Sequence, residues 1–304
     1  MTEHEITLPV MEIERFAIHD GPGIRSVVFM QGCPLHCPWC ANPESQTPGP
    51  KILYDKNKCV RCHTCLKNCP EHLITFDGHR MQFERNKCTG CRICQNYCPA
   101  KAINIIGKQY SISEIFDVLK RDRVYYEESN GGITFSGGEP FYQKENLIKM
   151  LVMAKKEYHF HTAIETCGAT DYRWIEEGEP YIDCFLFDVK YVDPVTLSNI
   201  VRGDGERILA NFRRLAESHG DKMTARVPCI PGYNYLEIRN IIDFIAESKV
   251  SRVNLLPYHT LGVGKYDNLD RSYELKGIPS MKASELNEIC EYGRKLGLSI
   301  TIGG

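Results

Sequence analysis

The segment SVVFMQGCPLHCPWCANPE, residues 26–44, decides how the chain is interpreted, because an apolar run leads directly into three closely spaced cysteines. Residues 26–30 have the apolar, β-branched composition of a buried strand. Cys33, Cys37 and Cys40 offer three thiolates, and no fourth cysteine follows nearby in the sequence. A metal site with three protein ligands keeps one position open for a substrate or cofactor. A partial zinc site or buried thiols are the alternatives.

Further along, the pattern K-C-x2-C-x2-C-x3-C-P occurs twice, at residues 58–70 and 87–99. This spacing is typical of cubane iron–sulfur clusters in which the last cysteine of each copy completes the cluster of the other copy. The pattern predicts a small inserted unit at about residues 51–102 that holds two 4Fe-4S clusters, and zinc fits eight cysteines in this spacing poorly. The expected ligand sets are Cys59, Cys62, Cys65 and Cys98 for one cluster, and Cys69, Cys88, Cys91 and Cys94 for the other.

The rest of the chain, residues 1–50 and 103–304, alternates short apolar runs with amphipathic segments. Such alternation predicts a parallel sheet with crossover helices, either open or closed into a barrel. The expected strands are residues 26–30, 133–136, 162–166, 182–189, 223–227, 253–256 and 298–302. The expected helices are residues 144–156, 207–218, 236–248 and 283–296.

Composition limits the possible partners and compartments. The chain has 304 residues, with 37 Lys and Arg against 39 Asp and Glu, so it carries no basic field for nucleic acid or a membrane surface. The N-terminal segment has acidic residues where a secretory signal needs basic ones, and no segment has a membrane-spanning length. We therefore expect a cytoplasmic protein whose grouped cysteines bind metal rather than form disulfides.

Several polar residues follow the expected strands, where the active sites of parallel α/β proteins are assembled. The segment SGGEP at residues 136–140 has a glycine pair that lets the backbone approach a ligand, although an ordinary turn is equally compatible with it. Residues 165–168 and 186–190 contribute carboxylates and a lysine, for which a buried salt bridge is the alternative. Arg226 and His259 follow two further strands, and a lone histidine is more often structural than catalytic.

Two segments flanking the three cysteines carry a resemblance to a known family. IHDGPGIR at residues 18–25 and WCANPE at residues 39–44 resemble the glycyl radical enzyme activating enzymes of the radical S-adenosylmethionine (SAM) superfamily, and the similarity extends across nearly the whole chain. The resemblance implies an α/β fold, a partial (β/α)6 radical SAM barrel with an inserted ferredoxin-like domain that holds two 4Fe-4S clusters. The insert resembles that of members activating glycerol and choline lyases, arylacetate decarboxylases and benzylsuccinate synthase.

The resemblance also implies roles for individual residues. Cys33, Cys37 and Cys40 would hold the catalytic 4Fe-4S cluster, whose open iron binds SAM, while Asp20 and Arg226 would contact the glycine loop of the partner or the cofactor. A monovalent cation beside the cofactor would be held by Glu165, Thr166, the Leu186 carbonyl and Asp188, with Glu165 in place of the usual aspartate. The residues expected to contact SAM are Trp39, Ala41, Gly137, Gly138, Glu139, Asp188, Val189, Lys190, Arg226 and His259.

The implied reaction is reductive cleavage of SAM to a 5'-deoxyadenosyl radical, which removes a hydrogen atom from one glycine of a partner glycyl radical enzyme. The implied cofactors are three 4Fe-4S clusters, SAM and a monovalent cation, with ferredoxin or flavodoxin as electron donor and a monomer as the simplest state. An iron–sulfur electron carrier, or a radical SAM enzyme acting on a small molecule, are the alternatives. No chemistry is assigned to Cys167, Cys184, Cys229 or Cys290, which are interpreted as buried thiols.

Overall fold

The computed structural model describes residues 7–303. The first six residues, part of the N-terminal segment expected to lack a secretory signal, lie outside this range. Within the described range, nine strands form one sheet in the order β13-β12-β11-β10-β9-β8-β2-β1-β7. Their bounds are β1 Thr7–Ala17, β2 Arg25–Met30, β7 Lys108–Ser111, β8 Gly132–Gly137, β9 Thr162–Thr166, β10 Cys184–Asp188, β11 Met223–Cys229, β12 Arg252–Pro257 and β13 Ser299–Ile302.

Strand pairing explains why this sheet is barrel-like. From β2 through β8 to β13 every neighbouring pair is parallel, and the order in space follows the order along the chain. The order never reverses, so the sheet lacks the switch point that defines a doubly wound fold. The two edge strands β7 and β13 do not pair with each other among the described residues, so the barrel is partial.

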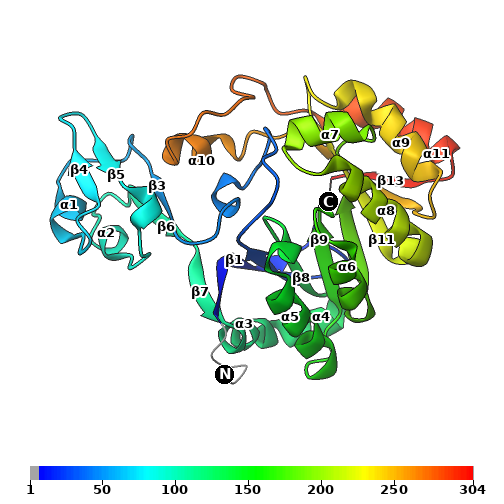
Figure 1. Cartoon of the computed structure of the whole chain (residues 1–304), viewed down its shortest axis with the longest axis horizontal. Helices are drawn as coiled ribbons and strands as arrows, with labels where there is room; N and C mark the ends of the chain where they lie inside the picture. The colour runs from blue at the N-terminus through cyan, green and yellow to red at the C-terminus, as the bar shows by residue number, and fades with distance from the viewer. Residues whose placement is uncertain (1–6, 304) are drawn as a thin grey trace.

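Helices cover the outer face of the sheet and bury its core (Figure 1). The strand centres carry fully buried side chains such as Val28, Phe135, Ile164 and Phe187. The helices of this part are α3 Ile112–Leu119, α4 Arg123–Ser129, α5 Lys144–Lys156, α6 Tyr172–Gly178, α7 Pro194–Val201, α8 Gly205–His219, α9 Ile238–Ala246, α10 Val263–Asn268 and α11 Asn287–Lys295.

All seven strands and all four helices expected from the sequence are present, with ends shifted by a few residues, among them β10 at Cys184–Asp188 and α9 at Ile238–Ala246. The expected helix at 283–296 begins with a 3-10 turn, Ala283–Leu286, before α11. Strands β1 and β7 were not expected. They pair antiparallel and extend the sheet beyond β2.

The cysteine-rich segment forms a separate lobe, drawn in cyan in Figure 1. It contains β3 Lys51–Tyr54, α1 Thr64–Asn68, β4 Ile74–Phe76, β5 Met81–Phe83, α2 Ile93–Asn96 and β6 Ile103–Ile106. Strand β3 pairs with β6, which begins directly after the expected boundary at residue 102. We therefore propose that the insert ends near residue 106.

A segment around α10 connects this lobe with the barrel (Figure 1). On one side, Asp270 accepts hydrogen bonds from Arg80 and Arg85 of the insert, at 2.9 and 2.8 Å. On the other, the Tyr266 hydroxyl donates to the Cys40 carbonyl at 3.0 Å and Lys265 pairs with Glu44 at 2.6 Å. None of the helices within residues 7–303 combines the length and apolar composition that a membrane crossing requires.

Candidate functional site

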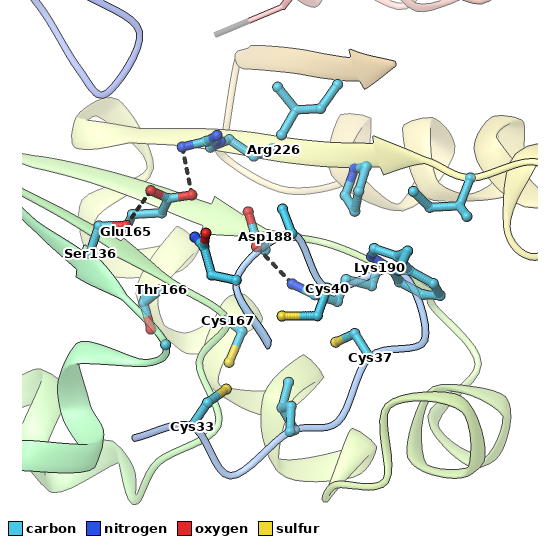
Figure 2. Close-up of a pocket in the computed structure, with 18 of the residues that line it drawn as sticks. Cys33, Cys37, Cys40, Ser136, Glu165, Thr166, Cys167, Asp188, Lys190 and Arg226 are labelled. Carbon is cyan, nitrogen blue, oxygen red and sulfur yellow. Dashed lines mark hydrogen bonds and ion pairs between the residues drawn. The ribbon is translucent and has the colours of Figure 1, made fainter. Parts of the chain in front are cut away.

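A cavity of about 260 Å³ opens at the carboxyl ends of the parallel strands. The cysteine loop after β2 lies on one side of it and the ends of β8 to β12 on the other (Figure 2). Thirteen residues that were expected in the site line this cavity: Cys33, Cys37, Trp39, Cys40, Ala41, Gly137, Gly138, Glu165, Thr166, Asp188, Lys190, Arg226 and His259.

The cysteine loop brings its three thiols to the same cavity. Backbone bonds from Gly32 to Ser45 and from Cys33 to Gln46, at 2.7 and 3.2 Å, fix the two ends of the loop. Burial raises the pKa of Cys37 to about 12 and that of Cys40 to about 11. A hydrogen bond with Cys167 lowers the pKa of Cys33. Thiolates are the form that ligates metal, so binding at this loop must displace protons from Cys37 and Cys40.

The glycine pair of SGGEP packs against the cysteine loop. Gly137 has a φ of +120°, and a Cβ there would lie 2.2 Å from the Met30 carbonyl oxygen. A Cβ on Gly138 would lie 2.3 Å from the Gly32 carbonyl oxygen. The glycines are therefore needed for close approach of two backbone segments, and both still line the cavity.

Glu139 faces away from the cavity lining. Its carboxylate is fully buried and accepts bonds from the Thr166 hydroxyl at 2.8 Å and the Cys167 amide at 2.8 Å. The Cys167 thiol donates to the same carboxylate at 3.0 Å. Glu139 thus ties the end of β8 to the end of β9, and the structure gives it a supporting position rather than an open one.

Two ion pairs stand on the cavity wall (Figure 2). Arg226 on β11 pairs with Glu165 on β9 at 2.8 Å, and the Ser136 hydroxyl donates to the other Glu165 oxygen at 2.6 Å. Lys190 donates to Asp188 at 2.7 Å. Burial lowers the pKa of Lys190, but the Asp188 carboxylate and nearby cysteines outweigh it and raise the pKa above its usual value.

The cavity contains buried polar atoms that no protein group satisfies. Asp188 Oδ1 and Arg226 Nε have no hydrogen-bond partner within the described part of the chain. Such buried atoms are costly unless a ligand or water pairs with them. SAM carries ribose hydroxyls and an amino group, which can donate to Asp188 Oδ1. It also carries a carboxylate, which can accept from Arg226 Nε. Together with three thiols at the same cavity, these atoms fit a 4Fe-4S cluster and SAM.

The other residues expected to contact SAM, the partner or a cation lie at the edge of the cavity or outside its lining. His259 is exposed at the cavity, and Trp39 packs edge-on against Tyr233 with ring centres 5.3 Å apart. Asp20 is half-buried outside the lining, where burial raises its pKa and Arg226 opposes that rise. Val189 and Leu186 are buried in the sheet and do not line the cavity.

Two of the four groups expected to hold a monovalent cation, Glu165 and Thr166, already have other partners. One Glu165 oxygen forms an ion pair with Arg226, and the other accepts a hydrogen bond from the Ser136 hydroxyl. The Thr166 hydroxyl donates to Glu139 and accepts from the Gly168 amide at 3.0 Å. In the described arrangement, Glu165 and Thr166 are therefore engaged with protein groups rather than free to hold a cation.

The eight insert cysteines surround two small cavities. Cys59, Cys62, Cys65 and Cys98 line one, and Cys69, Cys88, Cys91 and Cys94 line the other. Each cavity thus combines three cysteines of one repeat with the last cysteine of the other repeat. Within residues 7–303 no three Cys, His, Asp or Glu side chains are close enough to hold a single metal ion.

Sequence reasoning missed some residues of the site. Cys167 was interpreted as an ordinary buried thiol, yet it lies in the cavity against Cys33 (Figure 2). Ser136 and Tyr258 also line the cavity. The position of Cys167 after an expected strand was the one signal that could have indicated it.

Comparison with known proteins agrees with this geometry. The radical SAM superfamily profile matches residues 86–245, and a 4Fe-4S dicluster domain profile matches residues 53–105. The first match begins inside the insert and does not include the three-cysteine loop.

Similar proteins cover nearly the whole chain. The trans-4-hydroxy-L-proline dehydratase activating enzyme of Clostridioides difficile is 38% identical over 97% of this chain and 99% of its own length. The choline trimethylamine-lyase activating enzyme of Oleidesulfovibrio alaskensis is 36% identical over 96% of this chain and 97% of its own length.

A solved domain of a pyruvate-formate lyase-activating enzyme from Bacteroides vulgatus is 28% identical over 57% of this chain and 99% of its own chain, with a TM-score of 0.47. The assignment rests on the full-length relatives, which confirm the expected enzyme class and do not favour an electron carrier. The chain belongs to the radical SAM superfamily and, within it, to the enzymes that activate glycyl radical enzymes.

Proposed function

We propose that this chain binds SAM in the cavity between the Cys33, Cys37 and Cys40 loop and the ends of β8 to β12. The observation that carries the proposal is the convergence of three thiols with the unpaired atoms Asp188 Oδ1 and Arg226 Nε in one buried cavity. When bound, a reduced 4Fe-4S cluster and SAM supply a 5'-deoxyadenosyl radical that removes a hydrogen atom from a partner's glycine.

The protein's own contribution is binding, orientation and exclusion of water. Cys33, Cys37 and Cys40 would hold the cluster and leave one iron without a protein ligand. Asp188 would accept a hydrogen bond from the cofactor at Oδ1, while its other oxygen accepts from Lys190. Trp39, Ala41, the Gly137–Gly138 backbone and His259 would complete the SAM contacts from opposite sides of the cavity.

The glycine loop of the partner would enter beside the segment at residues 18–25. Ile18 is 63% exposed there, and Asp20 lies within electrostatic reach of Arg226. An exposed apolar side chain next to a charged pair suits a peptide rather than a small soluble substrate. This favours activation of a protein over action on a small molecule. The named relatives activate different enzymes, among them a hydroxyproline dehydratase and a choline lyase, so they do not identify the partner of this chain.

The insert would hold the second and third 4Fe-4S clusters in the two groups of four cysteines. We infer that ferredoxin or flavodoxin delivers electrons, and that the chain works as a cytoplasmic monomer without nucleic acid or membrane. The balanced charge, with 37 basic and 39 acidic residues, is compatible with such a transient protein partner.

The test is anaerobic SAM cleavage. The reconstituted, reduced protein is mixed with SAM, and 5'-deoxyadenosine is measured with and without a glycine-loop peptide from a glycyl radical enzyme encoded nearby. We expect cleavage that the peptide stimulates. Cleavage that a small-molecule mixture stimulates and the peptide does not would favour the small-molecule enzyme, and no cleavage at all would favour the electron carrier.

A further inference from the structure

The ion pair between Glu165 and Arg226 lies where the family resemblance predicts a monovalent cation. Glu165 and Arg226 lie on β9 and β11, two strands apart, because β10 runs between them. Neighbouring strands are about 4.8 Å apart, so only long side chains can meet across β10. The glutamate is one methylene, about 1.5 Å, longer than an aspartate. Its carboxylate reaches the guanidinium at 2.8 Å.

Both oxygens of the Glu165 carboxylate already contact protein groups. One oxygen faces Arg226, and the other accepts from the Ser136 hydroxyl at 2.6 Å. Side-chain exposure is 13% for Arg226 and 21% for Glu165, so the pair is shielded from bulk water and salt. The Thr166 hydroxyl is bonded to Glu139.

Apart from the three cysteines, the carboxylates and the cationic side chains that line the cavity are equal in number. Among the described residues that line it, the carboxylates are Glu165 and Asp188, and the cationic side chains are Arg226 and Lys190. Each carboxylate contacts one of the two cations. Burial lowers the pKa of Arg226, but Glu165, Asp188 and Asp20 outweigh it and raise the pKa above its usual value, so the guanidinium stays charged.

We propose that Arg226, held by Glu165, supplies the positive charge beside the cofactor site, so that SAM binding by this chain is independent of monovalent cations. Arg226 acts here as a cofactor-contacting residue: its Nη1 lies 2.8 Å from Glu165 as an ion pair, while its Nε has no hydrogen-bond partner among the described residues and remains available to a ligand. The inference rests on the proposed function, because it concerns the same SAM site.

The first experiment compares SAM binding by the wild-type holoenzyme in two buffers of equal ionic strength. One contains about 100 mM potassium chloride, and the other contains the same concentration of tetramethylammonium chloride, which is too large for a protein cation site. We expect dissociation constants that agree within about twofold. Tightening of SAM binding by potassium of about tenfold or more would overturn the proposal. Thallium(I) titration of the oxidised, cluster-loaded protein in a chloride-free buffer, followed by thallium NMR, gives a readout independent of activity and should show no saturable site.

The second experiment removes the guanidinium. In Arg226→Met, Glu165 and Asp188 outnumber Lys190, so we expect SAM affinity to fall by about tenfold or more in tetramethylammonium and to recover substantially in potassium. Equal loss in both buffers would contradict the charge-replacement role, because a purely structural defect gives no rescue by potassium. Glu165→Asp shortens the side chain that reaches Arg226. In this variant, potassium should tighten SAM binding as in Arg226→Met, but by a smaller factor.

The matched control is Arg252→Met. Arg252 is exposed at the start of the neighbouring strand β12, away from the cavity, and we expect its affinity for SAM to equal that of wild type in both buffers. If wild-type protein binds no SAM in either buffer, the proposed function fails. If it binds SAM only in potassium, the proposed function stands and the inference about Arg226 fails.

Discussion

The barrel and the insert both contain groups of cysteines, but the apolar core of the barrel is much larger than that of the insert. The barrel buries strand and helix side chains such as Phe135, Ile164 and Phe212 around one continuous core, and its cysteine loop lies at the edge of that core. The insert has nine buried core residues, and two of them, Cys65 and Cys94, are themselves expected ligands. So small a core seldom stabilises a fold without metal or disulfides.

The difference separates two uses of iron–sulfur clusters. In the insert each proposed group of four cysteines would leave no iron without a thiolate, and the clusters would supply folding energy. In the barrel three thiols leave one position open, and the fold would persist without the cluster. Removing one cysteine from each region should therefore have different consequences.

The largest expected effect comes from Cys37→Ala. Loss of one of three thiolates should remove the barrel cluster, lowering iron from about twelve to about eight per chain and SAM cleavage by about 10³-fold or more. Iron analysis and 5'-deoxyadenosine measurement check this. The matched control is Cys167→Ala, which removes a thiol from the same cavity that is bonded to Glu139, and it should keep about twelve irons. Loss of four irons in Cys167→Ala would make Cys167 a ligand and contradict the assignment.

Removal of iron with a chelator should unfold the insert and spare the barrel. We expect hydrogen exchange within residues 51–106 to accelerate by about 100-fold or more, because little apolar core remains there, whereas amides in β8 to β11 stay protected. Mass spectrometry of exchanged peptides measures both regions in one sample. Equal acceleration in the two regions would show that they fold as one unit.

The sequence predicts those features of the barrel and the insert that depend on neighbouring residues, and it misses those that depend on contacts between distant segments. The parallel strands and the cysteine groups follow from short patterns. The spacing of the repeat predicts that Cys59 and Cys98 share one cluster, and both residues line one cavity. The sequence predicts that the insert ends near residue 102, and it does not reveal that strand β6 pairs with β3 about fifty residues away. The contact of Cys167 with Cys33 also depends on distant segments meeting.

Charge pairing across the sheet was the least predictable feature. The sequence indicated that Glu165 replaces an aspartate, but not that the longer side chain reaches Arg226 over β10. Strand β1 escaped prediction because its outward face is polar and only Leu8, Val10 and Ala17 are buried. A pattern of this kind, with a bulge in its register, does not alternate cleanly.

A smaller effect is expected from Asp122→Asn in the barrel. Arg15 and Ser26 hydrogen-bond to Asp122, and the Arg15 guanidinium holds the pKa of this carboxyl below its usual value against the opposing effect of burial. A carboxyl whose pKa is depressed on folding stabilises the protein above its unfolded pKa of about 3.9 and loses that contribution as pH falls through the lower folded pKa.

The Asn variant should therefore unfold about 3 °C below wild type at pH 7, with the difference shrinking as the pH falls below about 4. Thermal unfolding followed by circular dichroism across this range measures it. A difference that stays constant down to about pH 3 would mean that Asp122 acts by packing rather than by charge.

The smallest expected effect lies at the contact between the two regions. Asp270→Asn weakens the ion pairs with Arg80 and Arg85, which are partly exposed, and should cost less than about 1 kcal/mol of stability. Hydrogen exchange should accelerate modestly in β4 and β5 alone. Faster exchange throughout the insert would show that this contact supports the whole lobe.

The most direct test of the central claim is electron paramagnetic resonance of the partner. The reduced holoenzyme and SAM are incubated anaerobically with the candidate glycyl radical enzyme, whose glycines carry deuterium. We predict a glycyl radical signal on the partner and deuterium in the 5'-deoxyadenosine, with both lost in Cys37→Ala. SAM cleavage without a partner radical and without deuterium transfer, across the glycyl radical enzymes encoded by the same organism, would contradict the account.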